Sequence, residues 1–368
     1  MVKLTLRLAL LLGASAPLSK AFVPKIGDSR SRSYNTARYA SIDEKTKLTD
    51  RQLQFWEDVD TGLLDIENFF AKKNQDINRI RQFAKRYAEQ MDPRKDTSIP
   101  PESSRAHFIS STLLFGSASG EVPPPTALGP GHEPSEEHVD GLTAKPYWDA
   151  ASEPDLFPWA AELEANADII QHEFATNMLN PKLFASDSAW QNQVMGGGWS
   201  AVRLQRLGEW NTFNCERFPK TYELLRSLQI PLAVRGVCFA KQAPGSGVQP
   251  HSDGRNFILT SHMGLKIPEG CWLQVGEERR EWQEGKLTTL DTSFSHSTGN
   301  DSTEDRHVLI IDYWHPELSE AERSALEFVY DLRNKFESGQ VRFRKPKSST
   351  NEEEGGLAKW WQSVTGGD

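Results

Sequence analysis

Between Trp199 and Trp314 the chain consists of short runs rich in β-branched and aromatic residues, and Gly and Pro separate these runs. Short apolar runs bounded by turn residues are typical of strands rather than of helices. Many short strands in one continuous stretch predict either a sandwich of two sheets or a barrel. The sequence shows no internal repeat. We therefore expect a mainly β core.

Helical patterns lie on both sides of this β region. Within residues 49–90, apolar residues recur at helical spacing and predict one or two amphipathic helices; these residues are Val59, Leu63, Ile66 and Phe70. A helical segment is also expected around residues 157–178, immediately before the strands. Residues 321–336 predict a closing helix after them.

A proline-rich stretch separates the first helical segment from the β region. Eight of the 21 prolines of the chain lie between Pro93 and Pro134, with few periodic apolar residues among them. This composition is typical of a linker that is partly disordered. We therefore expect four parts after the N-terminal signals: a helical segment (46–92), a Pro-rich linker (93–140), a globular body (141–325), and a C-terminal helix with a polar tail (326–368).

The N-terminus has the features of a targeting sequence in two parts. Residues 1–21 combine a basic start, an apolar stretch and a small-residue end, which is the pattern of a signal peptide. Residues 22–45 begin with a segment rich in Ser and Arg and predict a transit peptide. The junction Ala21-Phe22-Val23-Pro24 resembles that of plastid preproteins of diatoms and related algae. We expect transport to the plastid through the endoplasmic reticulum, with the secretory pathway lumen or secretion as the alternative.

Composition restricts the partners of the chain. The 42 Lys and Arg residues are outnumbered by 51 Asp and Glu residues, and this formal net charge of −9 argues against nucleic acid. No apolar run reaches the roughly 18 residues that a membrane span needs, so no transmembrane anchor is expected in the mature protein. Three scattered cysteines, Cys215, Cys238 and Cys271, do not form a disulfide framework or a zinc motif.

The residues with the clearest chemical potential are His251, Asp253, His296 and Arg306, in that order along the chain. In a strand, residues two apart point to the same face, so His251 and Asp253 can bind one metal ion together. A His followed two residues later by an acid occurs three times, so this pair alone carries little weight. With His296 it completes a set of two imidazoles and one carboxylate, which in non-haem Fe(II) oxygenases leaves positions for a 2-oxo acid and O₂. Arg306 then suits the far carboxylate of such a co-substrate.

Other polar and aromatic residues of the β region have structural interpretations. His307 and His315 are expected to be structural, because polar groups at strand ends usually bond to the backbone. Trp282 is expected in the core, and Cys271 is expected to be a packed thiol.

Several motifs follow one another in a fixed order over about residues 141–325: Gly141-Leu142, Lys145-Pro146-Tyr147-Trp148, Gly198-Trp199-Ser200, Pro219-Lys220-Thr221, Pro244-Gly245, His262-Met263-Gly264-Leu265, Gly270-Cys271, Trp282-Gln283-Glu284-Gly285-Lys286 and Asp312-Tyr313-Trp314-His315-Pro316-Glu317-Leu318. In these motifs the chain resembles the aspartyl/asparaginyl β-hydroxylase family. The resemblance implies a double-stranded β-helix (jelly roll, cupin-like) with flanking helices that uses Fe(II), 2-oxoglutarate and O₂. It also implies that His251 and His296 bind the metal, and that Arg306 and His262 bind the co-substrate.

Three positions differ from the family pattern. Asp253 stands where the animal peptidyl β-hydroxylase has a glycine, so this chain restores the carboxylate found in most 2-oxoglutarate oxygenases. Thr260 and Ala240 replace an arginine and a serine that contact the co-substrate in the animal enzyme. Arg255 or Lys241 is the expected replacement, and Arg255 is therefore a candidate co-substrate residue.

The sequence therefore predicts a 2-oxoglutarate-dependent dioxygenase that hydroxylates a C–H bond. By the resemblance, the first candidate substrate is a peptidyl Asp or Asn side chain. A lipid or small molecule is the alternative, since lipid hydroxylation is known among bacterial relatives. A non-catalytic, cupin-like binding protein is the remaining alternative, and the intact set of His251, Asp253, His296 and Arg306 argues against it.

Overall fold

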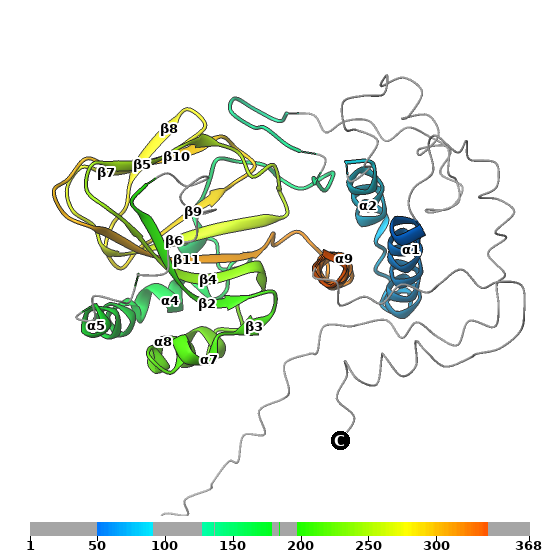
Figure 1. Ribbon diagram of the computed structural model, residues 1–368, viewed down its shortest axis with the longest axis horizontal. Helices are drawn as coiled ribbons and strands as arrows, with labels where there is room; N and C mark the ends of the chain where they lie inside the picture. The colour runs from blue at the N-terminus through cyan, green and yellow to red at the C-terminus, as the bar shows by residue number, and fades with distance from the viewer. Residues whose placement is uncertain (1–49, 91–126, 136, 179–183, 185–196, 338–368) are drawn as a thin grey trace, which may run out of the picture.

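Two antiparallel β-sheets face each other in the computed structural model, which describes residues 50–90, 127–135, 137–178, 184 and 197–337 (Figure 1). The larger sheet has seven strands in the order β1-β9-β6-β11-β4-β2-β3, and the smaller sheet has four in the order β5-β10-β7-β8. Every pairing between these strands is antiparallel. This architecture confirms the predicted mainly β fold of the jelly-roll type with flanking helices.

The strands of the larger sheet are β1 (Tyr147–Trp148), β2 (Trp199–Arg206), β3 (Glu209–Trp210), β4 (Leu232–Gln242), β6 (Ile258–Lys266), β9 (Leu287–Asp291) and β11 (Arg306–Trp314). Those of the smaller sheet are β5 (Ser246–His251), β7 (Cys271–Val275), β8 (Glu278–Glu281) and β10 (His296–Asn300). Except for β1, all of these strands lie in the region where the sequence predicts short strands.

Side chains of the central strands alternate between two buried faces. On β11, Leu309 and Ile311 belong to the apolar cluster beneath the larger sheet, whereas Val308 belongs to the cluster between the two sheets. The same alternation on β6 directs Thr260 and His262 to the space between the sheets, because Leu259 and Met263 belong to the lower cluster. Polar side chains in that otherwise apolar space need hydrogen-bond partners or a ligand.

Four helices cover the outer face of the larger sheet: α4 (Ala160–Ala165), α5 (Ala167–Asn177), α7 (Thr212–Cys215) and α8 (Pro219–Ser227) (Figure 1). The first two confirm the helical segment predicted around residues 157–178. The other two interrupt the region where only strands are predicted. Local capping explains them, since the side chain of Asn211 accepts a hydrogen bond from the Asn214 amide at 2.9 Å and Pro219 starts the second helix.

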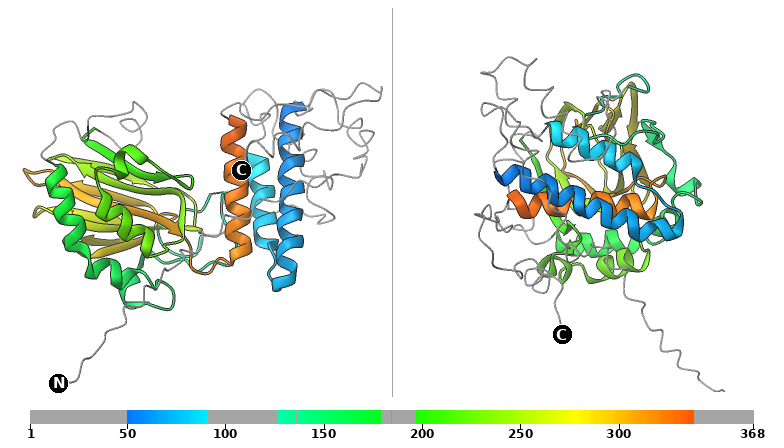
Figure 2. Two further views of the ribbon diagram at one scale, coloured as in Figure 1. Left: turned by 90° about the horizontal axis from the view of Figure 1, so that it is seen from below. Right: turned by 90° about the vertical axis from the view of Figure 1, so that its right-hand side faces the viewer.

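A separate group of three helices lies beside the β body: α1 (Asp50–Phe70), α2 (Asn78–Gln90) and α9 (Glu320–Glu337) (Figure 2). These helices confirm the predictions for residues 49–90 and 321–336. The four apolar residues on which the first of those predictions depends, namely Val59, Leu63, Ile66 and Phe70, are all buried.

The three-helix group shares one apolar core with the end of the larger sheet. The ring of Phe83 on α2 lies 5.4 Å from that of Phe257, which precedes β6. Arg79 on α2 binds Glu322 on α9 through two hydrogen bonds of 2.7 and 2.8 Å. The helical segment that precedes the Pro-rich stretch is therefore packed onto the body rather than held apart from it.

The predicted signal peptide, the transit peptide, most of the Pro-rich stretch and the polar tail lie outside the described residues. Within the part of the chain that the structure describes, no helix has the length and apolar character of a membrane span.

His315 and His307 are both buried, but they are accommodated differently. His315 has the backbone partners that the sequence predicts, since its Nε2 lies 3.1 Å from the Thr143 carbonyl and its Nδ1 accepts from the Glu317 amide at 3.2 Å. The ring of His307 packs instead against Phe174 and Phe184, with centroids 5.2 and 5.8 Å away. Neither of its nitrogens has a hydrogen-bond partner.

His307 predicts a loss of stability in mild acid. Burial lowers its pKa from 6.5 to about 4, so the unfolded chain takes up this proton as the pH falls below 6.5 while the folded chain does so only near 4. Between pH 7 and pH 5 this difference costs about 2 kcal/mol of unfolding free energy. Urea unfolding of His307→Leu is expected to decline less over that interval, by about the same amount. Parallel declines in parent and variant would contradict this assignment.

Candidate active site

His251, Asp253 and His296 come together at one end of the smaller sheet. His251 ends β5 and His296 begins β10, and the two residues are partners in the register of these strands. Their ring centroids are 4.3 Å apart. One ligand atom from each of the three residues lies within 4.8 Å of the other two. The structure thus brings the three predicted metal ligands close enough to share one ion.

A backbone carbonyl two residues earlier orients each imidazole. The Nδ1 of His251 lies 2.8 Å from the Gln249 carbonyl oxygen, and the Nδ1 of His296 lies 2.9 Å from that of Phe294. Since a carbonyl only accepts, each Nδ1 carries the proton and each Nε2 offers a lone pair. Contacts of this kind orient metal-binding histidines. Two such nitrogens and one carboxylate fit a non-haem Fe(II) ion.

The charges of the three residues also suit a divalent cation. Burial raises the pKa of the Asp253 carboxyl, but the cationic group of Arg235 and the nearby His296 outweigh this effect and hold the pKa well below its usual range. Burial lowers the pKa of His296. At neutral pH the site therefore presents an ionised carboxylate and a neutral imidazole, which are the forms that bind a metal.

Arg306 lies in the space between the sheets and is only 2% exposed. It donates to the side-chain oxygen of Gln242, and its guanidinium stands 4.4 Å from the ring centroid of Trp282. No carboxylate among the described residues pairs with it, and its Nε has no hydrogen-bond partner. Burial lowers its pKa to about 10, so it remains charged at neutral pH. A buried cation of this kind needs an anionic ligand.

His262 and Trp282 extend this pocket from Arg306. The indole of Trp282 donates to the Nδ1 of His262 at 3.3 Å, which leaves the proton of the neutral imidazole on Nε2. Burial, followed by the charge of Arg306, lowers the pKa of His262 to about 3. His262 is therefore a neutral hydrogen-bond donor. The sequence identifies Trp282 only as a core residue, although it contacts both predicted co-substrate residues.

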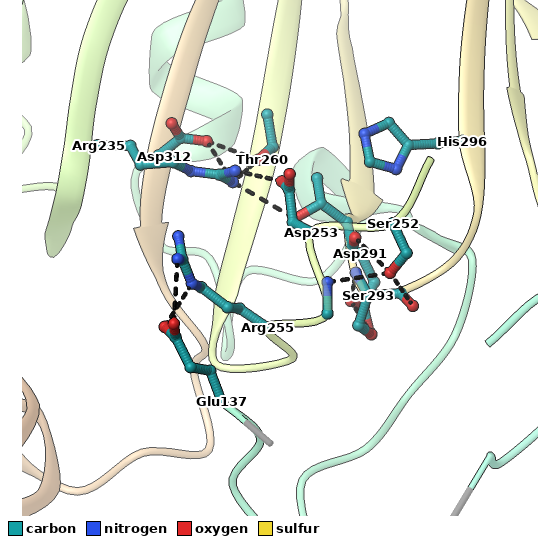
Figure 3. A network of polar contacts seen from close by, with 12 residues as sticks. Glu137, Arg235, Ser252, Asp253, Arg255, Thr260, Asp291, Ser293, His296 and Asp312 are labelled. Carbon is teal, nitrogen blue, oxygen red and sulfur yellow. Dashed lines mark hydrogen bonds and ion pairs between the residues drawn. The ribbon is translucent and has the colours of Figure 1, made fainter. Parts of the chain in front are cut away.

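The two expected replacements for the missing family contacts point elsewhere. The Nε of Arg255 donates to Glu137 at 2.7 Å (Figure 3). Its guanidinium lies 5.8 Å from the ring of Tyr330 on α9. Lys241 lies 3.7 Å from Asp305, and its ammonium lies 5.9 Å from the ring of Phe184, which packs against the apolar cluster beneath the larger sheet. The geometry gives no support to a co-substrate contact by Arg255 or Lys241.

Arg235, which lies outside every motif, occupies the place beside Thr260. Its Nη2 donates to the Thr260 hydroxyl at 3.0 Å, and its Nη1 donates to the Asp253 carboxylate (Figure 3). Sequence reasoning misses Arg235 because it acts only through tertiary contacts made by β4. No local pattern in the sequence reveals those contacts.

The described residues between 131 and 139 connect the two loops that carry the metal ligands. The Glu133 amide donates to the Ser293 carbonyl at 2.9 Å, and the Ser135 amide donates to the Gly254 carbonyl at 3.0 Å. The side chain of Ser252 donates to the Glu133 carbonyl at 2.9 Å. Gly254 has φ +70°, and a Cβ there would meet the Cβ of Ser135 at 2.4 Å. This end of the predicted linker is thus part of the site.

Comparison with known proteins agrees with this geometry. The Aspartyl/Asparaginyl beta-hydroxylase family matches residues 164–316. Aspartyl/asparaginyl beta-hydroxylase of Homo sapiens is 34% identical over 196 residues, which are 52% of this chain and 26% of that protein. Aspartate beta-hydroxylase domain-containing protein 2 of Rattus norvegicus is 36% identical over 159 residues, which are 39% of this chain and 46% of that protein. The chain therefore spans between a quarter and a half of the length of these relatives.

Among solved structures, an oxidoreductase of the 2OG-Fe(II) oxygenase family from Burkholderia pseudomallei overlaps with 34% of this chain and 73% of its own, at 11% identity and a TM-score of 0.26. This overlap is too small to indicate function. The motifs, the metal ligands and the sequence relatives agree on one assignment. Residues 164–316, which contain His251, His296 and Arg306, match the aspartyl/asparaginyl beta-hydroxylase family.

Proposed function

We propose that this protein is an Fe(II)- and 2-oxoglutarate-dependent dioxygenase that hydroxylates a C–H bond. The observation that carries this proposal is the buried guanidinium of Arg306, which has no carboxylate partner among the described residues, together with the cluster of His251, Asp253 and His296. The cluster alone requires only a cation. The buried positive charge requires an anion as well, and a dicarboxylate that binds the metal at one end satisfies both.

Fe(II), when bound with 2-oxoglutarate and O₂, supplies the oxidation: the 2-oxo acid loses CO₂, one oxygen atom enters succinate and the other becomes the new hydroxyl. The chain supplies binding and orientation. His251 and His296 offer Nε2 atoms, and Asp253 offers a carboxylate oxygen. Arg306 pairs with the far carboxylate of the co-substrate, and the Nε2–H of His262 is a further donor.

For the substrate we propose a peptidyl Asp or Asn side chain. The names of the relatives support this choice, although the chain covers only 26% of the human relative. A non-catalytic binding protein would not need to keep the three ligands and the unpaired arginine together.

Turnover of 2-oxoglutarate to succinate tests the proposal. The purified chain with Fe(II), 2-oxoglutarate and O₂ is expected to form succinate when peptides containing Asp or Asn are added, and the hydroxylated peptide should gain the mass of one oxygen atom. Lipid extracts form the second arm. Hydroxylation in that arm alone would replace the peptide by a lipid, and a folded protein that forms no succinate in any arm would contradict the enzyme.

The carboxylate ligand gives a graded prediction. Asp253→Ala leaves the two-histidine site that the family resemblance implies for the animal enzyme, so we expect retained turnover at higher iron concentration. Because Asp253 is proposed to bind the ion directly, the loss of Fe(II) affinity should be at least the roughly 10-fold that loss of a residue supporting a ligand causes. Turnover measured against Fe(II) concentration checks this result. Unchanged iron dependence would show that Asp253 is not a ligand.

We also propose that the N-terminal residues direct the protein to the plastid, on the basis of the sequence pattern alone. Residues 1–45 fused to a fluorescent protein are expected to reach the plastid of an algal host. Phe22→Ala should keep the reporter out of the stroma without blocking entry into the endoplasmic reticulum. Secretion of the unchanged fusion would instead favour a simple signal peptide.

A further inference from the structure

Arg235 lies between two carboxylates. Its Nη1 donates to the Oδ2 of Asp253, and its Nη2 lies 3.2 Å from the Oδ1 of Asp312 (Figure 3). The same Nη2 lies 3.0 Å from the hydroxyl of Thr260 and 3.3 Å from that of Thr292. Asp312 in turn accepts from the Thr260 hydroxyl at 2.6 Å. The guanidinium is thus bonded on two sides at once.

The two carboxylates belong to different parts of the fold. Asp253 lies in the loop that follows β5 of the smaller sheet, whereas Asp312 lies within β11 of the larger sheet. Among the described residues, the metal-binding cluster contains Asp253 and does not contain Asp312. Arg235 therefore ties a metal ligand on a loop to a carboxylate on a central strand, and that strand is held by pairing with both β4 and β6.

The charge balance also depends on Arg235. Asp312 is 7% exposed and Asp253 is half-buried, and two carboxylates this close to one guanidinium repel each other unless a cation stands between them. The planar guanidinium has several N–H donors and bonds to both carboxylates at once. The ammonium group of a lysine, whose charge and donors are on one nitrogen atom, cannot reproduce this geometry. The Oδ2 of Asp253 accepts from Arg235, and the carboxylate still offers one oxygen atom to the metal-binding cluster.

We propose that Arg235 is the positioning residue of the metal site: by bridging Asp253 to Asp312 and Thr260, it fixes the carboxylate ligand in the orientation that binds the ion. This inference rests on the proposed iron site. It assigns to Arg235 an effect on metal affinity that passes entirely through Asp253. It assigns no contact with the far carboxylate of 2-oxoglutarate, because both Nη atoms already have partners.

The test measures the affinity of the full chain for Co(II), an ion that does not react with O₂ and whose visible spectrum reports its ligands. Arg235→Lys keeps the charge but loses the bridge, so affinity should fall by about 10- to 100-fold with an altered spectrum. Arg79→Lys is the matched control, because Arg79 also binds a carboxylate, Glu322, but lies in the three-helix group. This control should leave Co(II) affinity unchanged.

A double-mutant cycle separates positioning from a general structural role. In the Asp253→Ala background, Arg235→Lys should cause no further loss of Co(II) affinity, because the residue through which it acts is gone. Equal losses in both backgrounds would overturn the inference. So would an unchanged Co(II) affinity combined with weaker 2-oxoglutarate binding, because that result would make Arg235 a co-substrate residue.

Asp312→Asn keeps the inference testable if Arg235→Lys does not fold. This variant keeps the contact between Arg235 and Asp253 but weakens the contact between Arg235 and residue 312. A smaller loss of Co(II) affinity is therefore expected, and only when Asp253 is present. A loss that persists in Asp253→Ala would overturn the inference. Failure of the proposed function looks different, since the parent protein would then bind Co(II) no better than His296→Ala does.

Discussion

His296→Ala is expected to abolish both iron binding and turnover. His296 is one of the three candidate ligands that the described residues bring together, and the remaining imidazole and carboxylate cannot hold a labile divalent ion against water. The loss of affinity should exceed the roughly 100-fold that is the upper range for residues that only support a ligand. Iron content after anaerobic loading and gel filtration, together with succinate formation, measures the two effects.

His172→Ala is the matched control for this variant. His172 is exposed on α5, on the far side of the larger sheet from the metal ligands. Its loss should leave iron content and turnover at the level of the parent. If His296→Ala retains iron and turnover like the control, the metal site lies elsewhere in the chain.

Arg306→Lys is expected to weaken 2-oxoglutarate binding by about ten- to a hundredfold, since a charged hydrogen bond of this kind contributes about 1.5–3 kcal/mol and lysine cannot reproduce the bidentate contact. Arg306→Ala should have a larger effect, because it also removes the positive charge. The affinity for Fe(II) without co-substrate should barely change, since Arg306 is not among the metal-binding residues. The dependence of succinate formation on 2-oxoglutarate concentration checks this result.

The separation of the two affinities is what makes this prediction specific. A variant that is only misfolded would lose iron as well as co-substrate. An unchanged 2-oxoglutarate dependence in Arg306→Ala would remove the assignment of Arg306. Arg255 would then be the next candidate for binding the far carboxylate of 2-oxoglutarate, although it forms an ion pair with Glu137.

The candidate metal ligands could be identified from the sequence through the order of His251, Asp253 and His296 within the family motifs, because the pair His251 and Asp253 alone has a spacing that occurs three times in the chain. The structure adds that His296 is the partner of His251 in the pairing of two strands. The helices α1 and α9 could also be predicted from the sequence. Their apolar residues recur with the helical period, so they lie on one face of each helix, and these faces pack into one core.

Features that depend on tertiary contacts could not be predicted in this way. Arg235 reaches Asp253 and Asp312 only after β4, β11 and the loop following β5 come together. The short helix α7 depends on a single cap at Asn211. One capping residue is too weak a signal to predict a helix in a region where the surrounding sequence predicts strands. The end of the Pro-rich stretch reads as a linker by composition, yet backbone hydrogen bonds such as that from Ser135 to Gly254 fix it onto the ligand loops.

The most direct test of the central claim is an anaerobic titration of the protein with Fe(II) and then with 2-oxoglutarate, followed by visible absorption. We expect a metal-to-ligand charge-transfer band that appears only when both are present, because the 2-oxo acid then binds the iron. The band should be absent in His296→Ala and should need more 2-oxoglutarate in Arg306→Lys. A folded parent protein that shows no band with both ligands in excess, or a band that persists in His296→Ala, would contradict the account.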